Sequence, residues 1–199
     1  MKGSKGMDRR IFRTRTMIFQ AFLVILQKKP YHEISIVDIA EQADINRSTF
    51  YAHFIDKEDL LQKMIADKLD LLAERIRIGV EPSHSTPSFN DPDLIFLALF
   101  EHVFEHDYFY QVMLPKDAAG DFRNQFNGLI REAFFARLSK LGIEQKLQVP
   151  LDILLDYISC STIGIMEKWL TDSKIYSPHH MALQLTRLGF LGIYKSTGM

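Results

Sequence analysis

Apolar residues recur at helical spacing along nearly the whole chain. In residues 9–28, for example, Ile18, Phe22 and Ile25 fall on one face of a helix. Similar stripes, bounded by Pro, Gly, Ser or Asp, predict helices at about 9–28, 36–43, 47–54, 57–78, 92–106, 107–114, 121–141, 150–170 and 178–194. No segment alternates with a period of two over the length that a sheet requires. The pattern therefore predicts an all-α protein with about nine helices.

Two of the predicted helices, 36–43 and 47–54, are short and adjacent. Ser35 suits the N-cap of the first, and Asp38 places a negative charge in its first turn. Asp44 lies where the chain must turn, and Asp tolerates a left-handed backbone. The outer face of the second helix carries hydrogen-bond donors and no acidic residue: Arg47, Ser48, Thr49, Tyr51 and His53. This pattern is typical of a helix-turn-helix that enters the DNA major groove.

The same stretch resembles a known family. The runs S-I-V-D-I-A from Ser35, I-N-R-S-T-F-Y-A-H-F and D-K-E-D-L-L are similar to the DNA-binding domain of the TetR family of bacterial transcriptional regulators. The resemblance implies an N-terminal three-helix helix-turn-helix domain at residues 1–62. It also implies a helical effector-binding and dimerisation domain at residues 63–199. Asp44 departs from the family pattern, in which Gly is commoner in the turn.

The resemblance also implies the DNA contacts. Arg47, Ser48 and Thr49 are expected at base edges. The residues expected mainly at phosphates are Ser35, Tyr51, His53 and Lys57. Because one short helix covers few base pairs, we expect a homodimer that binds a pseudo-palindromic operator in double-stranded DNA.

The charge distribution fits a DNA-binding N-terminal part. Residues 1–57 contain ten Lys or Arg and six Asp or Glu, a net charge of +4, whereas the whole chain carries −1.

The single cysteine excludes an internal disulfide and fits a reducing cytoplasm. The N-terminus lacks the apolar region of a signal peptide, and no apolar run approaches the ~20 residues of a membrane span. We therefore expect a cytoplasmic protein without a membrane segment.

The C-terminal part resembles one class of TetR-family regulators through F-E-H-V-F-E-H-D-Y-F-Y-Q-V-M-L, G-I-M-E-K-W-L and Y-S-P-H-H-M-A. Some members of that class act beside dihydroxyacetone-kinase-like proteins. The resemblance leaves two alternatives open: a small-molecule effector or a partner protein. Aromatic residues at helical spacing are more often core than pocket, but an apolar effector cavity would fit here. Its predicted lining is Tyr108, Tyr110, Tyr157 and Met166.

The last two predicted helices are expected to form the dimer interface as a four-helix bundle. They carry Ile153, Leu154, Tyr157, Ile158, Ile165 and Trp169 on one helix, and Leu185, Leu188 and Gly192 on the other. Gly192 has no side chain and would permit close approach of the helices.

The sequence gives little indication of a metal site or of catalysis. His102 and His106 share a helix face, but Val103 stands where a metalloprotease H-E-x-x-H motif requires Glu. No metal site, cofactor or enzymatic activity is expected, because no phosphate-binding loop, nucleophile elbow or paired-carboxylate motif is present. The sequence predicts a DNA-binding regulator. Of the two alternatives, it favours a repressor whose affinity for DNA is changed by an effector. The alternative is a co-regulator or activator whose C-terminal body binds a dihydroxyacetone-kinase-like partner.

Overall fold

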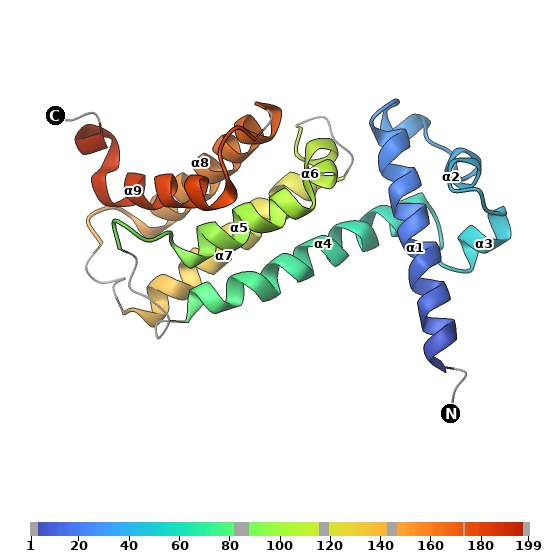
Figure 1. Cartoon of the computed structure of the whole chain (residues 1–199), viewed down its shortest axis with the longest axis horizontal. Coiled ribbons are helices and arrows are strands. Elements are labelled where there is room, and N and C mark those ends of the chain that lie inside the picture. The colour runs from blue at the N-terminus through green and yellow to red at the C-terminus, as the bar shows by residue number, and fades with distance from the viewer. Residues whose placement is uncertain (1–3, 82–87, 116–119, 143–146, 173, 197–199) are drawn as a thin grey trace. The chain divides into compact units, whose positions relative to one another are not determined.

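The computed structural model describes residues 4–81, 88–115, 120–142, 147–172 and 174–196 (Figure 1). Within these residues every regular element is a helix, and nine are α-helices, so the predicted all-α fold is confirmed. The elements are α1 (Ser4–Leu26), the 3₁₀ turn η1 (Tyr31–Glu33), α2 (Ile36–Gln42), α3 (Arg47–Tyr51), α4 (Lys57–Val80), α5 (Leu94–Glu105), α6 (Asp107–Met113), α7 (Phe122–Lys140), α8 (Leu151–Thr171) and α9 (Pro178–Ser196).

Several helix ends differ from the predicted positions, and the largest difference is at α1, which begins at Ser4 instead of residue 9. α3 ends at Tyr51 instead of residue 54, because the chain turns there before α4 begins. α5 begins at Leu94 instead of residue 92. Its N-cap is Asp93, whose Oδ1 accepts a hydrogen bond from the Ile95 N–H (2.8 Å).

The chain divides into two compact units. Unit 1 comprises Met1–Lys68 and Val112–Phe122, and unit 2 comprises Leu69–Gln111 and Arg123–Met199. Unit 1 is therefore not one continuous stretch of chain. The functional boundary at residue 62 rests on the family resemblance and stays a prediction.

Unit 1 is built around α1, which packs against α2, while α2 packs against α3. Phe22, Phe50 and Phe54 are buried in its core. Apolar residues from the α6–α7 region are buried too, among them Met113 and Phe122. Burial of this apolar surface supplies most of the unit's stability.

Within unit 2, α5 and α9 lie side by side (Figure 1). Phe100 on α5 packs edge-on against Trp169 on α8, with ring centroids 5.2 Å apart. The Trp169 indole N–H donates to the Tyr176 carbonyl oxygen (2.9 Å), which fixes the turn after α8. These contacts place Trp169 in the core, where its one polar atom is satisfied.

Candidate nucleic-acid interface

The entrance to α2 is a capping box. The Ser35 backbone N–H and hydroxyl both donate to Asp38 Oδ2 (2.7 Å each), and the Asp38 N–H donates to Ser35 Oγ (3.2 Å). These bonds from Ser35, with Lys29 nearby, hold the pKa of Asp38 well below its usual range. The predicted N-cap is confirmed. Its consequence is a fixed starting point for the helix-turn-helix.

The turn between α2 and α3 is a Schellman motif. Asp44 has φ of 52°, in the left-handed region. Its N–H donates to the Glu41 carbonyl (3.1 Å), and the Ile45 N–H donates to the Ala40 carbonyl (3.0 Å). The chain therefore makes with Asp the turn that the resembling family usually makes with Gly.

Helix α3 has a buried rear and an exposed front. Phe50 is fully buried, whereas Arg47 and Ser48 are exposed and Thr49 is half-buried. Tyr51 is half exposed and lies edge-on to Phe50, with centroids 5.6 Å apart. Asn46 occupies the N-cap position, although its side chain makes no capping bond. The exposed donors lie at the start of α3, the part of a recognition helix that reaches base edges.

His53 follows α3 and is partly buried. Burial, and then the positive charge of Arg15, lower the pKa of His53 below its ordinary value of 6.5. Arg15 lies over the Phe54 ring (5.7 Å) and pairs with Asp67 (3.4 Å). Neutral His53 retains one N–H that can donate to a phosphate oxygen.

Lys57 lies in a different environment from the other predicted DNA contacts. Its ammonium donates to the backbone carbonyls of Tyr31 (2.8 Å) and Ile34 (2.7 Å). It also lies over the Tyr31 ring, 4.3 Å from the centroid. Tyr31 is a partner that the sequence did not predict, because no local pattern links residues 26 positions apart.

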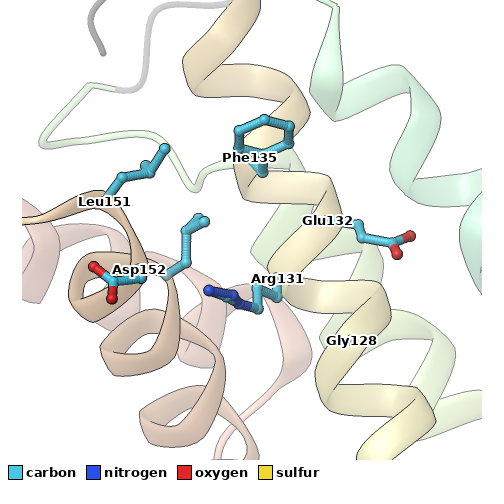
Figure 2. Close-up of a pocket in the computed structure, with 7 residues that line it drawn as sticks. Gly128, Arg131, Glu132, Phe135, Leu151 and Asp152 are labelled. Atoms are coloured by element: carbon cyan, nitrogen blue, oxygen red, sulfur yellow. The ribbon is translucent and has the colours of Figure 1, made fainter. Parts of the chain in front are cut away.

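A groove of about 610 Å³ lies between α7 and α8 in unit 2. Phe135, Leu151 and Leu155 supply apolar lining. Arg131 extends from α7 toward α8, whereas the Glu132 carboxylate points away from α8 (Figure 2). Arg131 Nε donates to Asp156 Oδ1 (3.2 Å). The groove can accept an apolar group beside a partly neutralised cation.

None of the four predicted effector residues lines this groove. Tyr110 and Met166 are fully buried, Tyr157 is exposed on α8, and Tyr108 is partly exposed on α6. Their role in effector binding stays a prediction. Phe135 was not predicted to line a groove, because an aromatic residue next to Phe134 is expected in the core. Of the two, only Phe134 is buried.

The predicted dimer residues fall into three groups. Ile153, Tyr157 and Leu188 are exposed on α8 and α9. Leu154, Ile158 and Ile165 are half-buried. Trp169 and Leu185 are buried within their own chain. They therefore pack in the core and offer almost no surface to a second copy.

Gly192 bends α9, and its predicted part in a close approach of helices stays a prediction. Its φ of 64° and ψ of −175° interrupt the helical conformation of α9. Only a residue that accepts this left-handed backbone makes the bend without strain.

Two features are absent from the part of the chain that the structure describes. There, no three His, Cys, Asp or Glu residues are placed to hold a metal ion. Among the same residues, no helix is both long and apolar enough to cross a lipid bilayer.

Comparison with known proteins gives two family matches. Residues 18–64 match the model for "Bacterial regulatory proteins, tetR family", and residues 90–189 match that for "Transcriptional regulator C-terminal region". The chain is 29% identical over 199 residues to the uncharacterized HTH-type transcriptional regulator YxbF of Bacillus subtilis (strain 168). That match covers 96% of this chain and 48% of YxbF, so the chain spans about half of that relative.

Two further comparisons concern DhaS, by sequence, and FadR, by structure. The dhaKLM operon transcriptional activator DhaS of Lactococcus lactis subsp. lactis (strain IL1403) is 44% identical over 48 residues, 24% of this chain and 26% of DhaS. The structure of the regulator FadR from Bacillus subtilis in complex with stearoyl-CoA superposes with a TM-score of 0.68 at 18% identity. It covers 89% of this chain and 98% of FadR, and at that identity the likeness shows the fold alone.

Proposed function

Because the chain belongs to the TetR family of bacterial transcriptional regulators, we propose that it controls transcription by binding a pseudo-palindromic DNA duplex as a homodimer. The matched families contain regulators and not enzymes, which agrees with the non-enzymatic prediction. Its site of action is the cytoplasm, where the DNA lies.

The helix-turn-helix geometry carries this proposal. The capping box fixes the start of α2, the Schellman turn sets the angle to α3, and buried Phe50 orients the front of α3 outward. Arg47, Ser48 and Thr49 then read base edges. Phosphates are bound by Ser35, Tyr51, His53 and Lys57.

The sign of regulation is repression, relieved by a small molecule bound in the helical body. Two observations support this part of the proposal. The groove between α7 and α8 has an apolar lining. FadR, which shares the fold, was captured with stearoyl-CoA, so a helical body of this kind accommodates a ligand with a long apolar chain. DhaS is an activator whose sequence match covers 24% of this chain and whose structure superposes over 92% of it with a TM-score of 0.53. Because FadR superposes more closely, with a TM-score of 0.68, the partner-protein alternative is less favoured.

The test is selection of genomic DNA fragments by the purified full chain. We expect enrichment of fragments that share a pseudo-palindrome, and the genes beside them would suggest effectors to add to the binding reaction. Uniform recovery of all fragments would contradict the proposal.

Arg47→Ala provides the matched comparison. It should relax the preference at one position of each half-site by about 1–3 kcal/mol, if Arg47 binds guanine with two hydrogen bonds. Lys63→Ala is the control, because it removes an equal charge whose ammonium pairs with Asp59. An unchanged preference in Arg47→Ala would remove Arg47 from the base-reading set.

A further inference from the structure

We propose that three exposed arginines of α1, Arg9, Arg10 and Arg13, form a second DNA-binding surface, which we call the α1 patch. The α1 patch binds the sugar–phosphate backbone beside the groove that α3 reads, and it reads no bases itself. This inference rests on the proposed function, because it adds a contact surface to the same DNA-binding unit.

The three arginines share one face of α1. Arg9 and Arg13 are four positions apart, and Arg10 and Arg13 are three apart, so their side chains are neighbours on the helix surface. All three side chains are exposed. Like charges at these spacings repel each other and destabilise a helix. A bound polyanion would relieve this repulsion, because it neutralises the three charges together.

The charge of the α1 patch is not balanced by nearby carboxylates. Residues 9–32 contain six Lys or Arg and no Asp or Glu. Two of these six cations have partners from elsewhere in the chain: Arg15 pairs with Asp67 (3.4 Å), and Lys29 pairs with Asp38 (2.9 Å). Among the residues that the structure describes, no carboxylate forms an ion pair with an arginine of the α1 patch. The patch therefore presents three charges to an external anion.

The first turns of α1 lie outside the core of unit 1. Ile18 and Phe22 are buried, whereas Ile11 and Phe12, earlier on the same helix, are 44% and 73% exposed. Figure 1 shows this end of α1 extending past α2 and α3, with no other described element of unit 1 beside it. Core packing therefore does not explain the arginines, and replacing them leaves the core intact.

Arg15 connects the α1 patch to the helix-turn-helix. Its guanidinium lies 5.7 Å from the centre of the Phe54 ring, and Phe54 directly follows His53, a proposed phosphate ligand. At 1.5 Å per residue, Arg13 and Arg9 lie about 3 Å and about 9 Å from Arg15 along the helix axis. Duplex DNA carries one negative charge per about 1.7 Å of its axis. The duplex that contacts His53 therefore offers phosphates to the α1 patch as well.

A basic helix with exposed apolar side chains is also typical of binding to an anionic membrane surface. DNA is favoured here for two reasons. The α1 patch belongs to the same compact unit as the helix-turn-helix, and only two exposed apolar side chains, Ile11 and Phe12, lie among the arginines. Two such side chains bury little apolar surface in a membrane.

The test is the salt dependence of DNA binding by the full chain carrying Arg9→Gln, Arg10→Gln and Arg13→Gln together. Gln keeps a high helix propensity and removes the charge. Each phosphate contact adds about 0.9 to the slope of log affinity against log salt concentration, so the slope should fall by about 2.7. Raising salt from about 50 mM to about 200 mM should then weaken wild-type binding about 40-fold more than binding by the triple variant.

A matched control removes three charges from exposed side chains of unit 2 by Arg77→Gln, Lys140→Gln and Lys168→Gln. Its slope should equal that of the wild-type chain. Arg13→Gln alone should lower the slope by about 0.9. An unchanged slope in the triple variant, or an equal fall in the control, would overturn the proposal. So would unchanged DNA binding combined with arginine-dependent binding to phosphatidylserine vesicles.

A second comparison separates this proposal from the proposed function. The ratio of affinities for a selected fragment and for an unrelated duplex of equal length should be the same in the wild-type chain and the triple variant, because the α1 patch contacts no bases. A ratio that falls in the triple variant would overturn its role as a backbone-binding surface. If the wild-type chain prefers no fragment but its slope on unrelated DNA still depends on the arginines, the proposed function fails and the α1 patch is upheld.

Discussion

At the scale of single residues, the helix-turn-helix depends on backbone conformations that particular side chains tolerate. Asp44 sits at φ 52° between α2 and α3, where Gly would carry no steric penalty. The two hydrogen bonds of the turn come from backbone N–H groups and do not need the Asp carboxylate. The position is therefore under mild strain that a substitution can relieve.

Asp44→Gly should stabilise the protein by up to about 1 kcal/mol, because the left-handed conformation costs an L residue roughly that much. Asp44→Val should destabilise it, since a β-branched side chain fits this conformation poorly. Chemical unfolding of the three proteins measures both effects. A less stable Asp44→Gly variant would show that the carboxylate itself contributes to the turn.

We expect His53 to make DNA binding depend on pH. A phosphate beside the ring would raise its lowered pKa, so binding should take up a proton and strengthen as pH falls. We expect affinity to rise by about threefold to tenfold between pH 8 and pH 6. Fluorescence anisotropy of labelled operator DNA at fixed salt measures this affinity at each pH. His53→Gln should lose this dependence, whereas His32→Gln, at an exposed position, should keep it; the same dependence in both variants would exclude His53 as its source.

The same residue affects the free protein with the opposite sign. Because folding lowers the pKa of His53, the unfolded chain binds the proton first as the solution is acidified. The stability that neutral His53 contributes is complete above pH 6.5 and is lost as pH falls through the lowered pKa of the folded state.

Local contacts were predictable from the sequence and distant ones were not. The Ser35 cap and the Asp44 turn depend on neighbours within five residues, so residue type and spacing were sufficient to identify them. The expected phosphate contact of Lys57 rests on the family resemblance and not on its side-chain partners. The acceptors of Lys57 lie 26 and 23 residues away, and only folding brings them together.

At the scale of helices, one buried polar network joins three elements of unit 2. Arg137 on α7 forms an ion pair with Asp93 at the start of α5, and both side chains are 7% exposed. The Asp93 N–H donates to the Thr186 hydroxyl on α9 (2.8 Å), and that hydroxyl donates to the Ala182 carbonyl (2.8 Å). This network explains why α5 begins at Leu94. Asp93, the residue before it, is fixed by contacts to α7 and α9 that cannot be predicted from neighbouring residues in the sequence.

Arg137→Leu should destabilise the protein by about 3–5 kcal/mol, because it leaves the Asp93 carboxylate buried without its cation. Arg131→Leu is the control, since the Arg131–Asp156 pair is more exposed and its loss should cost about 1 kcal/mol or less. Urea unfolding followed by circular dichroism measures both. Equal losses in the two variants would mean that the Arg137 pair is hydrated in solution.

At the scale of the whole molecule, the proposed homodimer uses the exposed apolar positions of α8 and α9. Periodicity identified these two helices, but it could not separate the side chains that face a second copy from those that face α5. Trp169 and Leu185 were assigned to the interface and lie in the core. The distinction depends on which neighbour each helix face meets in the folded chain.

Leu188→Glu should convert the dimer to monomer, because Leu188 is 43% exposed and a buried interface would not accommodate an unpaired carboxylate. Leu71→Glu is the control, since Leu71 is 52% exposed on α4. Sedimentation velocity separates the two states. A dimeric Leu188→Glu variant, or a monomeric Leu71→Glu variant, would place the interface elsewhere.

Unit 1 is made of two separate stretches of chain, and this limits the exchange of domains between this regulator and others. Met113, Leu114 and Phe122 are buried in the same unit as the helix-turn-helix, although they follow it by more than forty residues. Gly120 lies so close to α4 that an added Cβ would stand 3.0 Å from Leu61 Cδ2. A hybrid that joined residues 1–62 to the body of another regulator would thus leave part of its own core behind. The operator specificity of this chain is more readily transplanted by exchanging surface residues of α3 than by exchanging a domain.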